Sequence, residues 1–217
     1  MEKLPAFLNN QKYLLVNEIL SAITHGIGVG LSIAAAIVLI IHGVHEGGGM
    51  RITTFVIYGI LLVLFYLAST LFHSLYFTKA EHLFQIFDHS AIYLLIAGTY
   101  LPYSLVTIGG KLGWLIITVI WLMAIIGIVY KSLWMGKFKI ASTIIYVVMG
   151  WFCILGVHRL IIGLGWSGFL LLLAGGITFT FGAVIYSFRA IPFGHVIWHL
   201  FVLAGTTLMY FSIYFYV

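Results

Sequence analysis

Long runs of apolar residues, each broken by only a few polar positions, dominate the chain from residue 19 to its end. A helix that crosses the hydrocarbon core of a bilayer needs about 20 such residues. Seven runs approach or exceed this length, at residues 19–41, 52–76, 84–107, 112–130, 140–158, 166–187 and 195–216. The runs are continuous and do not alternate as barrel strands do, so we expect an all-α fold of seven transmembrane helices.

The composition supports insertion into a membrane. Hydrophobic residues make up 63% of the 217 residues and charged residues only 7%, whereas a soluble domain carries about 25% charged residues. The connections between runs are short and carry turn residues such as Pro192, so we expect residues 1–217 to form a single transmembrane domain. The first 17 residues contain no apolar core followed by a cleavage site, and we expect no removable signal peptide.

The basic residues are unevenly divided between the two sides of the predicted bundle. With seven crossings, the N-terminus shares a side with the loops after the second, fourth and sixth helices. That side carries Lys3, Lys12, Lys79, Lys131, Lys137, Lys139 and Arg189, and the other side carries Arg51, Lys111 and Arg159. Cytoplasmic loops are enriched in Lys and Arg, so we expect a cytoplasmic N-terminus and an external C-terminus. The net charge of +5 is spread over these loops, which argues against a nucleic-acid partner.

Some residues that resemble functional features have simpler interpretations. The glycines at 26, 28 and 30 lie in an apolar run with no strand before them, so we interpret them as helix-packing positions and not as a nucleotide-binding loop. Cys153 is the only cysteine, which excludes an intrachain disulfide. Pro102 is expected to kink the third helix.

Five polar residues in three predicted helices form the candidate site. Ser69 and His73 close the second helix, Asp88 lies near the start of the third, and His195 and His199 begin the seventh. Residues four apart share a helical face, so His195 and His199 can approach one point together. At a rise of ~1.5 Å per residue, the histidines and Asp88 fall within roughly 10 Å of the inner boundary. Ionisable residues are costly inside a membrane, so this group indicates a functional site.

Three imidazoles with a carboxylate nearby suit zinc, because three nitrogen ligands leave the fourth tetrahedral position for water. The alternative is that the histidines only hydrogen-bond to each other and to the bundle. In the first helix, His25 lies two turns after Glu18 and either pairs with it or packs within the bundle. His89 directly follows Asp88 and therefore points elsewhere, so we expect it to pack. Solvated or interfacial positions are expected for His42, His45, His82 and His158.

At these residues the chain resembles the bacterial hemolysin III family, within the superfamily of progestin and adiponectin receptors and alkaline ceramidases. The matching segments span nearly the whole chain: Asn17-Glu18, Thr24-His25-Gly26, Ser69-x3-His73, Asp88-His89-Ser90, Gly98-Thr99-Tyr100-x-Pro102 and His195-x3-His199. The resemblance implies a seven-helix bundle in the bacterial plasma membrane, with an intracellular N-terminus and a zinc ion held by His73, His195 and His199. It also implies that Asp88 holds the zinc-bound water and that Ser69 is a polar neighbour of the zinc ligands.

Three functions remain open on the sequence. The first is an intramembrane hydrolase of lipid amide or ester bonds, in which zinc acidifies water, Asp88 transfers the proton, and Ser69 assists as a second candidate catalytic residue. The second, suggested by the family name, is a cytolytic or pore-forming protein, although a secreted toxin must leave the cell that makes it. The third is a membrane sensor with structural zinc. Membrane lipids are the expected partners, and the sequence identifies neither a protein partner nor an oligomeric state.

Overall fold

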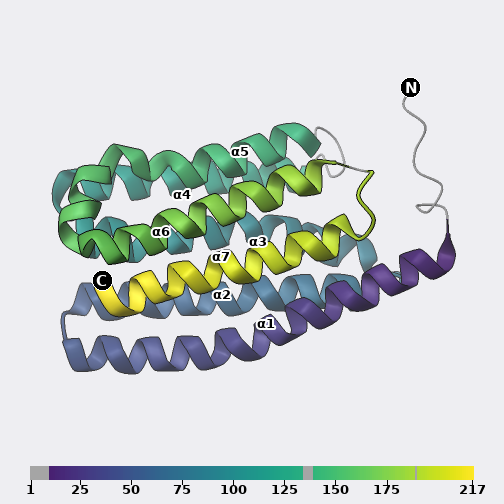
Figure 1. The fold of residues 1–217 in the computed structure, drawn as a ribbon, viewed down its shortest axis with the longest axis horizontal. Coiled ribbons are helices and arrows are strands. Elements are labelled where there is room, and N and C mark those ends of the chain that lie inside the picture. Colours follow the sequence, from purple (N-terminus) through teal and green to yellow (C-terminus); the bar gives the residue numbers. More distant parts are fainter. Residues whose placement is uncertain (1–9, 134–138, 189) are drawn as a thin grey trace.

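The computed structural model describes residues 10–133, 139–188 and 190–217, and every regular element within them is helical. Figure 1 shows the helices packed lengthwise into one bundle. Their bounds are α1 Gln11–Glu46, α2 Gly49–Ser74, α3 Glu81–Leu101, η2 Pro102–Ile108, α4 Gly110–Leu133, α5 Lys139–Trp151, η3 Phe152–Gly156, α6 Val157–Ser187 and α7 Gly194–Tyr216. The all-α prediction is confirmed. Three of the predicted cytoplasmic basic residues, Lys3, Lys137 and Arg189, lie outside the described residues.

Six helical stretches of the described residues are long and apolar enough to cross a membrane. The longest, Ser142–Ser187, has 46 residues, which would extend about 70 Å as one straight helix against a hydrocarbon core of about 30 Å. It is interrupted at Gly165, where φ is 63° and ψ is 175°. This interruption lies between residues 158 and 166, where the sequence predicts a turn, and Figure 1 shows α5 and α6 running side by side.

Local sequence explains the length of α1 and the turn that follows it. The Asn10 side chain accepts hydrogen bonds from the backbone N–H groups of Lys12 and Tyr13, at 2.9 and 3.4 Å. This N-cap satisfies backbone N–H groups of the first turn, which have no partner within the helix. The helix therefore starts at Gln11, eight residues before the apolar run that begins at residue 19. Gly47 and Gly48 have φ values of 77° and 91°, which favour glycine, and they reverse the chain between α1 and α2.

The expected disturbance at Pro102 takes the form of a change in helix type. Proline has no N–H to continue the hydrogen-bond ladder of α3, and residues Pro102–Ile108 form the π-helix η2. The hydroxyl of Tyr103 in this segment donates to the carbonyl of Met209 on α7, at 3.2 Å. The segment that continues α3 is thereby attached to the C-terminal half of α7.

The surface of the bundle is apolar, as a lipid-facing surface requires. Large aliphatic side chains point outward, among them Ile162, which is 70% exposed, and Ile126, which is 67% exposed. Between helices, Gly28 packs directly on the ring of Tyr66, where a Cβ atom would collide, whereas Gly30 faces open space. Close packing is therefore confirmed for Gly28. The start of α1, the end of α2 and the starts of α3 and α7 lie at one end of the bundle (Figure 1).

Candidate metal centre

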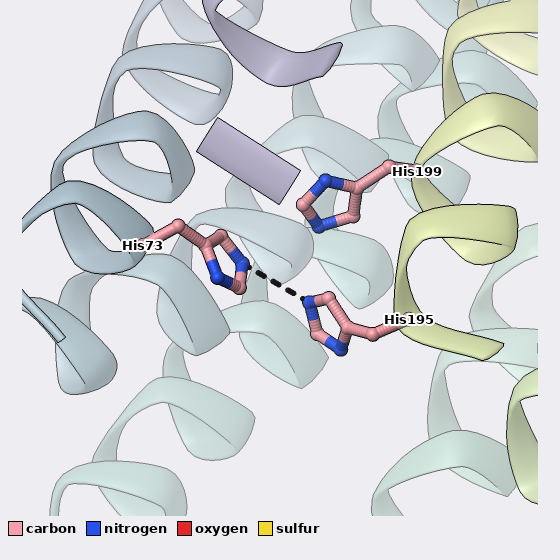
Figure 2. A group of neighbouring side chains, drawn as sticks. All are labelled: His73, His195 and His199. Atoms are coloured by element: carbon pink, nitrogen blue, oxygen red, sulfur yellow. Dashed lines mark hydrogen bonds between the residues drawn. The ribbon is translucent and has the colours of Figure 1, made fainter. Parts of the chain in front are cut away.

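Three histidines from two helices meet at this end of the bundle. His73 lies in the last turn of α2, and His195 and His199 lie four residues apart in the first turns of α7. Figure 2 shows the three rings facing one another. The Nε2 atoms of His73 and His195 are 3.1 Å apart, and one ligand atom from each of the three histidines lies within 4.8 Å of the others. The three histidines predicted to be metal ligands therefore lie close together.

The carboxylate of Glu18, on α1, holds the outer side of His73. Its Oε2 atom lies 2.6 Å from Nδ1 of His73, and both side chains are buried. The other oxygen of Glu18 accepts a hydrogen bond from the side-chain amide of Asn17, at 3.1 Å. Because a carboxylate accepts, the Nδ1–H of His73 donates, and the lone pair of Nε2 faces the other histidines.

His199 is held in the same way by a different part of α1. Its Nδ1 atom lies 3.2 Å from the carbonyl oxygen of Ser21 and 3.2 Å from the hydroxyl of Thr24. A carbonyl can only accept, so Nδ1 carries the proton and Nε2 presents its lone pair. The ring of His25 stacks on His199 with centroids 3.5 Å apart and planes at 10°. Helix α1 therefore orients two of the three histidines.

The geometry fits zinc. Zinc holds imidazole nitrogens at about 2.0–2.1 Å in a tetrahedral arrangement, which places any two of them about 3.3 Å apart. The 3.1 Å separation of His73 and His195 is close to this value, and the 4.8 Å limit for the whole group requires a contraction of at most about 1.5 Å. Imidazole ligands with hydrogen-bonded outer nitrogens are also the usual arrangement around such an ion.

Asp88 and Ser69 lie outside this group of three. Asp88 is buried on α3, where its Oδ2 atom lies 3.9 Å from Nδ1 of the adjacent His89. The same Nδ1 atom of His89 lies 2.8 Å from the carbonyl oxygen of Gln85 on its own helix. Ser69 lies one turn before His73 and is 1% exposed, and its hydroxyl has no hydrogen-bond partner among the described residues. The structure therefore brings the three histidines together, places Ser69 one turn before His73, and leaves Asp88 outside the group.

The sequence pattern identified Glu18 and His25 but not what they do. The two side chains do not pair with each other, because Glu18 bonds to His73 and His25 stacks on His199. Both ring nitrogens of His25 and the Ser21 hydroxyl are buried without a partner among the described residues. Glu18, Ser21 and His25 have helical spacing within an apolar run, and this pattern on one face could have indicated a shared role.

Comparison with known proteins agrees with these residues and this arrangement. A family model described as "Haemolysin-III related" matches residues 13–210. The chain is 50% identical over 200 residues to "Hemolysin-3" of Bacillus cereus, an alignment that covers 92% of this chain and 91% of that protein. It is 45% identical over 204 residues to the "Hemolysin-3 homolog" of Bacillus subtilis (strain 168), covering 94% of this chain and 96% of the relative.

A more distant similarity reaches an animal protein. The human "Monocyte to macrophage differentiation factor" is 33% identical over 181 residues, which are 81% of this chain and 74% of that protein. The apolar helices place the chain among multi-pass membrane proteins. Its bacterial relatives indicate that this membrane is a bacterial plasma membrane. The match over residues 13–210, together with the two bacterial relatives, shows that this chain belongs to the haemolysin-III-related family.

Proposed function

We propose that this protein is an intramembrane hydrolase that cleaves amide or ester bonds of membrane lipids with the help of one zinc ion. The observation that carries the proposal is the convergence of His73, His195 and His199, whose ligand atoms lie within 4.8 Å of one another. Three nitrogen ligands leave a position open, as in catalytic zinc sites, whereas structural sites use four protein ligands. When bound, zinc would polarise a carbonyl and acidify water near pH 7.

The residues around the histidines position the ligand rings and transfer protons. Glu18 and the Ser21 carbonyl fix the rings of His73 and His199, so that both Nε2 lone pairs point to one place. Asp88, a carboxylate outside the ligand group, takes the proton from the attacking water and returns it to the leaving group. Ser69 offers a buried hydroxyl, with no partner among the described residues, one turn from His73.

An apolar cavity that is lined in part by residues next to His199 on α7 supports a lipid substrate. It has a volume of about 110 Å³ and lies between α3, α5, α6 and α7. Trp198 and Val202 line it on α7, on either side of His199 in sequence, and Phe65 lines it on α2. Apolar cavities of ~150 Å³ stay dry and bind hydrocarbon groups. A lipid chain in this cavity would bring the bond near its headgroup toward the histidines.

We also propose that the chain crosses the membrane seven times with its N-terminus in the cytoplasm. The non-helical Gly165 divides the 46-residue stretch Ser142–Ser187 into two segments, each of about 22 residues and therefore long enough to cross. The bundle then has the histidines at its cytoplasmic end, where the basic residues are more numerous.

Lipid mass spectrometry of bacterial lipid extracts incubated with the purified protein tests the proposed activity. We expect new fatty acid or amine products that disappear when a zinc chelator is added and return with added zinc. Unchanged lipids in the presence of zinc-loaded protein would refute the hydrolase.

A second candidate follows from the similarity to proteins named Hemolysin-3 and Hemolysin-3 homolog. On this proposal the protein would damage membranes of other cells. Release of haemoglobin from erythrocytes by purified protein, in the same amount with and without chelator, would favour cytolysis over zinc-dependent hydrolysis.

A further inference from the structure

A second hollow lies on the side of the bundle, between α1, α2 and α7. We name it the lateral groove. It has a volume of about 180 Å³, and its lining includes Gly28, Leu31, Ala35, Leu62, Thr207 and Phe211. The groove is separate from the cavity described above, because the hydroxyls of Tyr66 and Thr206 join α2 to α7 at 2.6 Å. Phe65 lines the cavity, and its neighbour Tyr66 lines the groove.

The lateral groove has two defined ends. At its inner end, Gly28 lies one turn after His25, and Tyr66 packs on both of these residues. At its outer end, the Tyr210 hydroxyl donates to the carbonyl of Ala35, at 3.2 Å, and bridges α7 to α1. Gly28 and Ala35 are seven residues apart, or about 10 Å along the helix. The lateral groove therefore begins one helical turn from His25, whose ring stacks on His199.

The hydroxyl groups of the lateral groove already have partners. Ser32 donates to the carbonyl of Val29 at 2.9 Å, and Thr207 donates to that of Leu203 at 2.7 Å. Thr206 and Tyr210 are engaged in the bridges given above. A water molecule in such a place would need two to four polar partners. The groove therefore suits an apolar occupant better than water.

We propose that the lateral groove binds one hydrocarbon chain of a membrane lipid and directs it toward the histidines. The delivery of the hydrocarbon chain to the histidines rests on the proposed function, whereas binding of the chain in the groove does not require hydrolysis. The bilayer is the source of the chain, because Leu31 and Phe211, which line the groove, are 57% and 41% exposed on the lipid-facing surface. The bound hydrocarbon chain would differ from the ordinary lipid around the protein, because the groove encloses it with walls on three helices and is closed at Tyr210.

Photochemical labelling in lipid nanodiscs tests the proposal. The probe is a straight-chain fatty acid with a diazirine in the middle of its chain, and the labelled peptides are mapped by mass spectrometry. We expect labelling of groove residues that excess unlabelled palmitic acid reduces at least tenfold. If the probe only samples ordinary surrounding lipid, labelling will spread over the outer faces of α1 and α7, and unlabelled palmitic acid will reduce it little. This result would overturn the proposal.

Matched variants locate the chain. Ala35→Trp fills the lateral groove, whereas Ala34→Trp places the same ring on the exposed neighbouring position of α1. On α7, Thr207→Trp and Ala204→Trp form a second pair of this kind. We expect the groove-filling variants to lose the competed labelling at least tenfold and the controls to keep it, all four eluting as monodisperse protein. Equal labelling of both members in each pair would overturn the proposal.

The same preparations separate this proposal from the proposed function. Competed labelling without any lipid hydrolysis would support the groove and refute the hydrolase. Hydrolysis that continues at the parent rate in Ala35→Trp, together with labelling that palmitic acid does not reduce, would refute the groove and leave the hydrolase in place.

Discussion

Glu18 is the residue whose substitution tests the role of α1 most sharply. Its carboxylate lies 2.6 Å from Nδ1 of His73 and is buried, so water cannot replace it at low cost. We predict that Glu18→Gln and Glu18→Ala weaken zinc binding in that order while leaving all three histidines in place. The effect should appear in the affinity for zinc and not in the number of ions bound at saturation.

The magnitude follows from the type of hydrogen bond. A bond to a charged group contributes about 1.5–3 kcal/mol and a neutral one about 0.5–1.5 kcal/mol. Glutamine can still accept through its amide oxygen, so Glu18→Gln should lose about 1–1.5 kcal/mol, or about tenfold in affinity. Alanine leaves the Nδ1–H of His73 buried without its acceptor, and we expect a loss near 100-fold, the upper end for such outer partners.

Competition with a chelator of known affinity, on protein in detergent or nanodiscs, measures these differences. Asn17→Ala serves as the control, because it removes only the amide that donates to the other oxygen of Glu18, and it should change the affinity by less than about threefold. An affinity of Glu18→Ala equal to that of the parent protein would refute the claim that this carboxylate orients His73.

Two further predictions concern the chemistry and the topology. Asp88→Asn should retain most of the zinc and lose hydrolysis, because asparagine keeps the size of the side chain but cannot take a proton. His73→Ala should lose both the zinc and hydrolysis. Loss of zinc from Asp88→Asn as complete as that from His73→Ala would identify Asp88 as a ligand. Reporter fusions should place the N-terminus in the cytoplasm and the C-terminus outside, and a C-terminal reporter active in the cytoplasm would contradict seven crossings from an inner N-terminus.

Much of the fold is predictable because a membrane allows few alternatives. Apolar runs must become helices in lipid, and the spacing of His195 and His199 on one helix fixes their common face. The turn near Gly165 was also predictable, since two runs of spanning length meet there. The start of α1 was not, because the cap at Asn10 depends on a single side chain outside the apolar run.

The partners of the histidines were harder to predict from the sequence. Helical spacing shows that Glu18 and His25 lie on one face of α1, but it cannot show which helix that face meets. The contacts with His73 and His199 depend on the side-by-side packing of α1 with both α2 and α7, which is a tertiary property. Likewise, the lateral groove depends on the close approach of Gly28 and Tyr66.

The metal content of the purified protein tests the central claim most directly. By elemental analysis, we predict about one zinc per chain for the parent protein and almost none for the double variant His195→Ala and His199→Ala. The matched control is His42→Ala, a histidine that packs on Tyr214 away from the group, and it should keep the zinc of the parent. Absence of zinc from the parent protein, or an unchanged zinc content in the double variant, would contradict the proposed site.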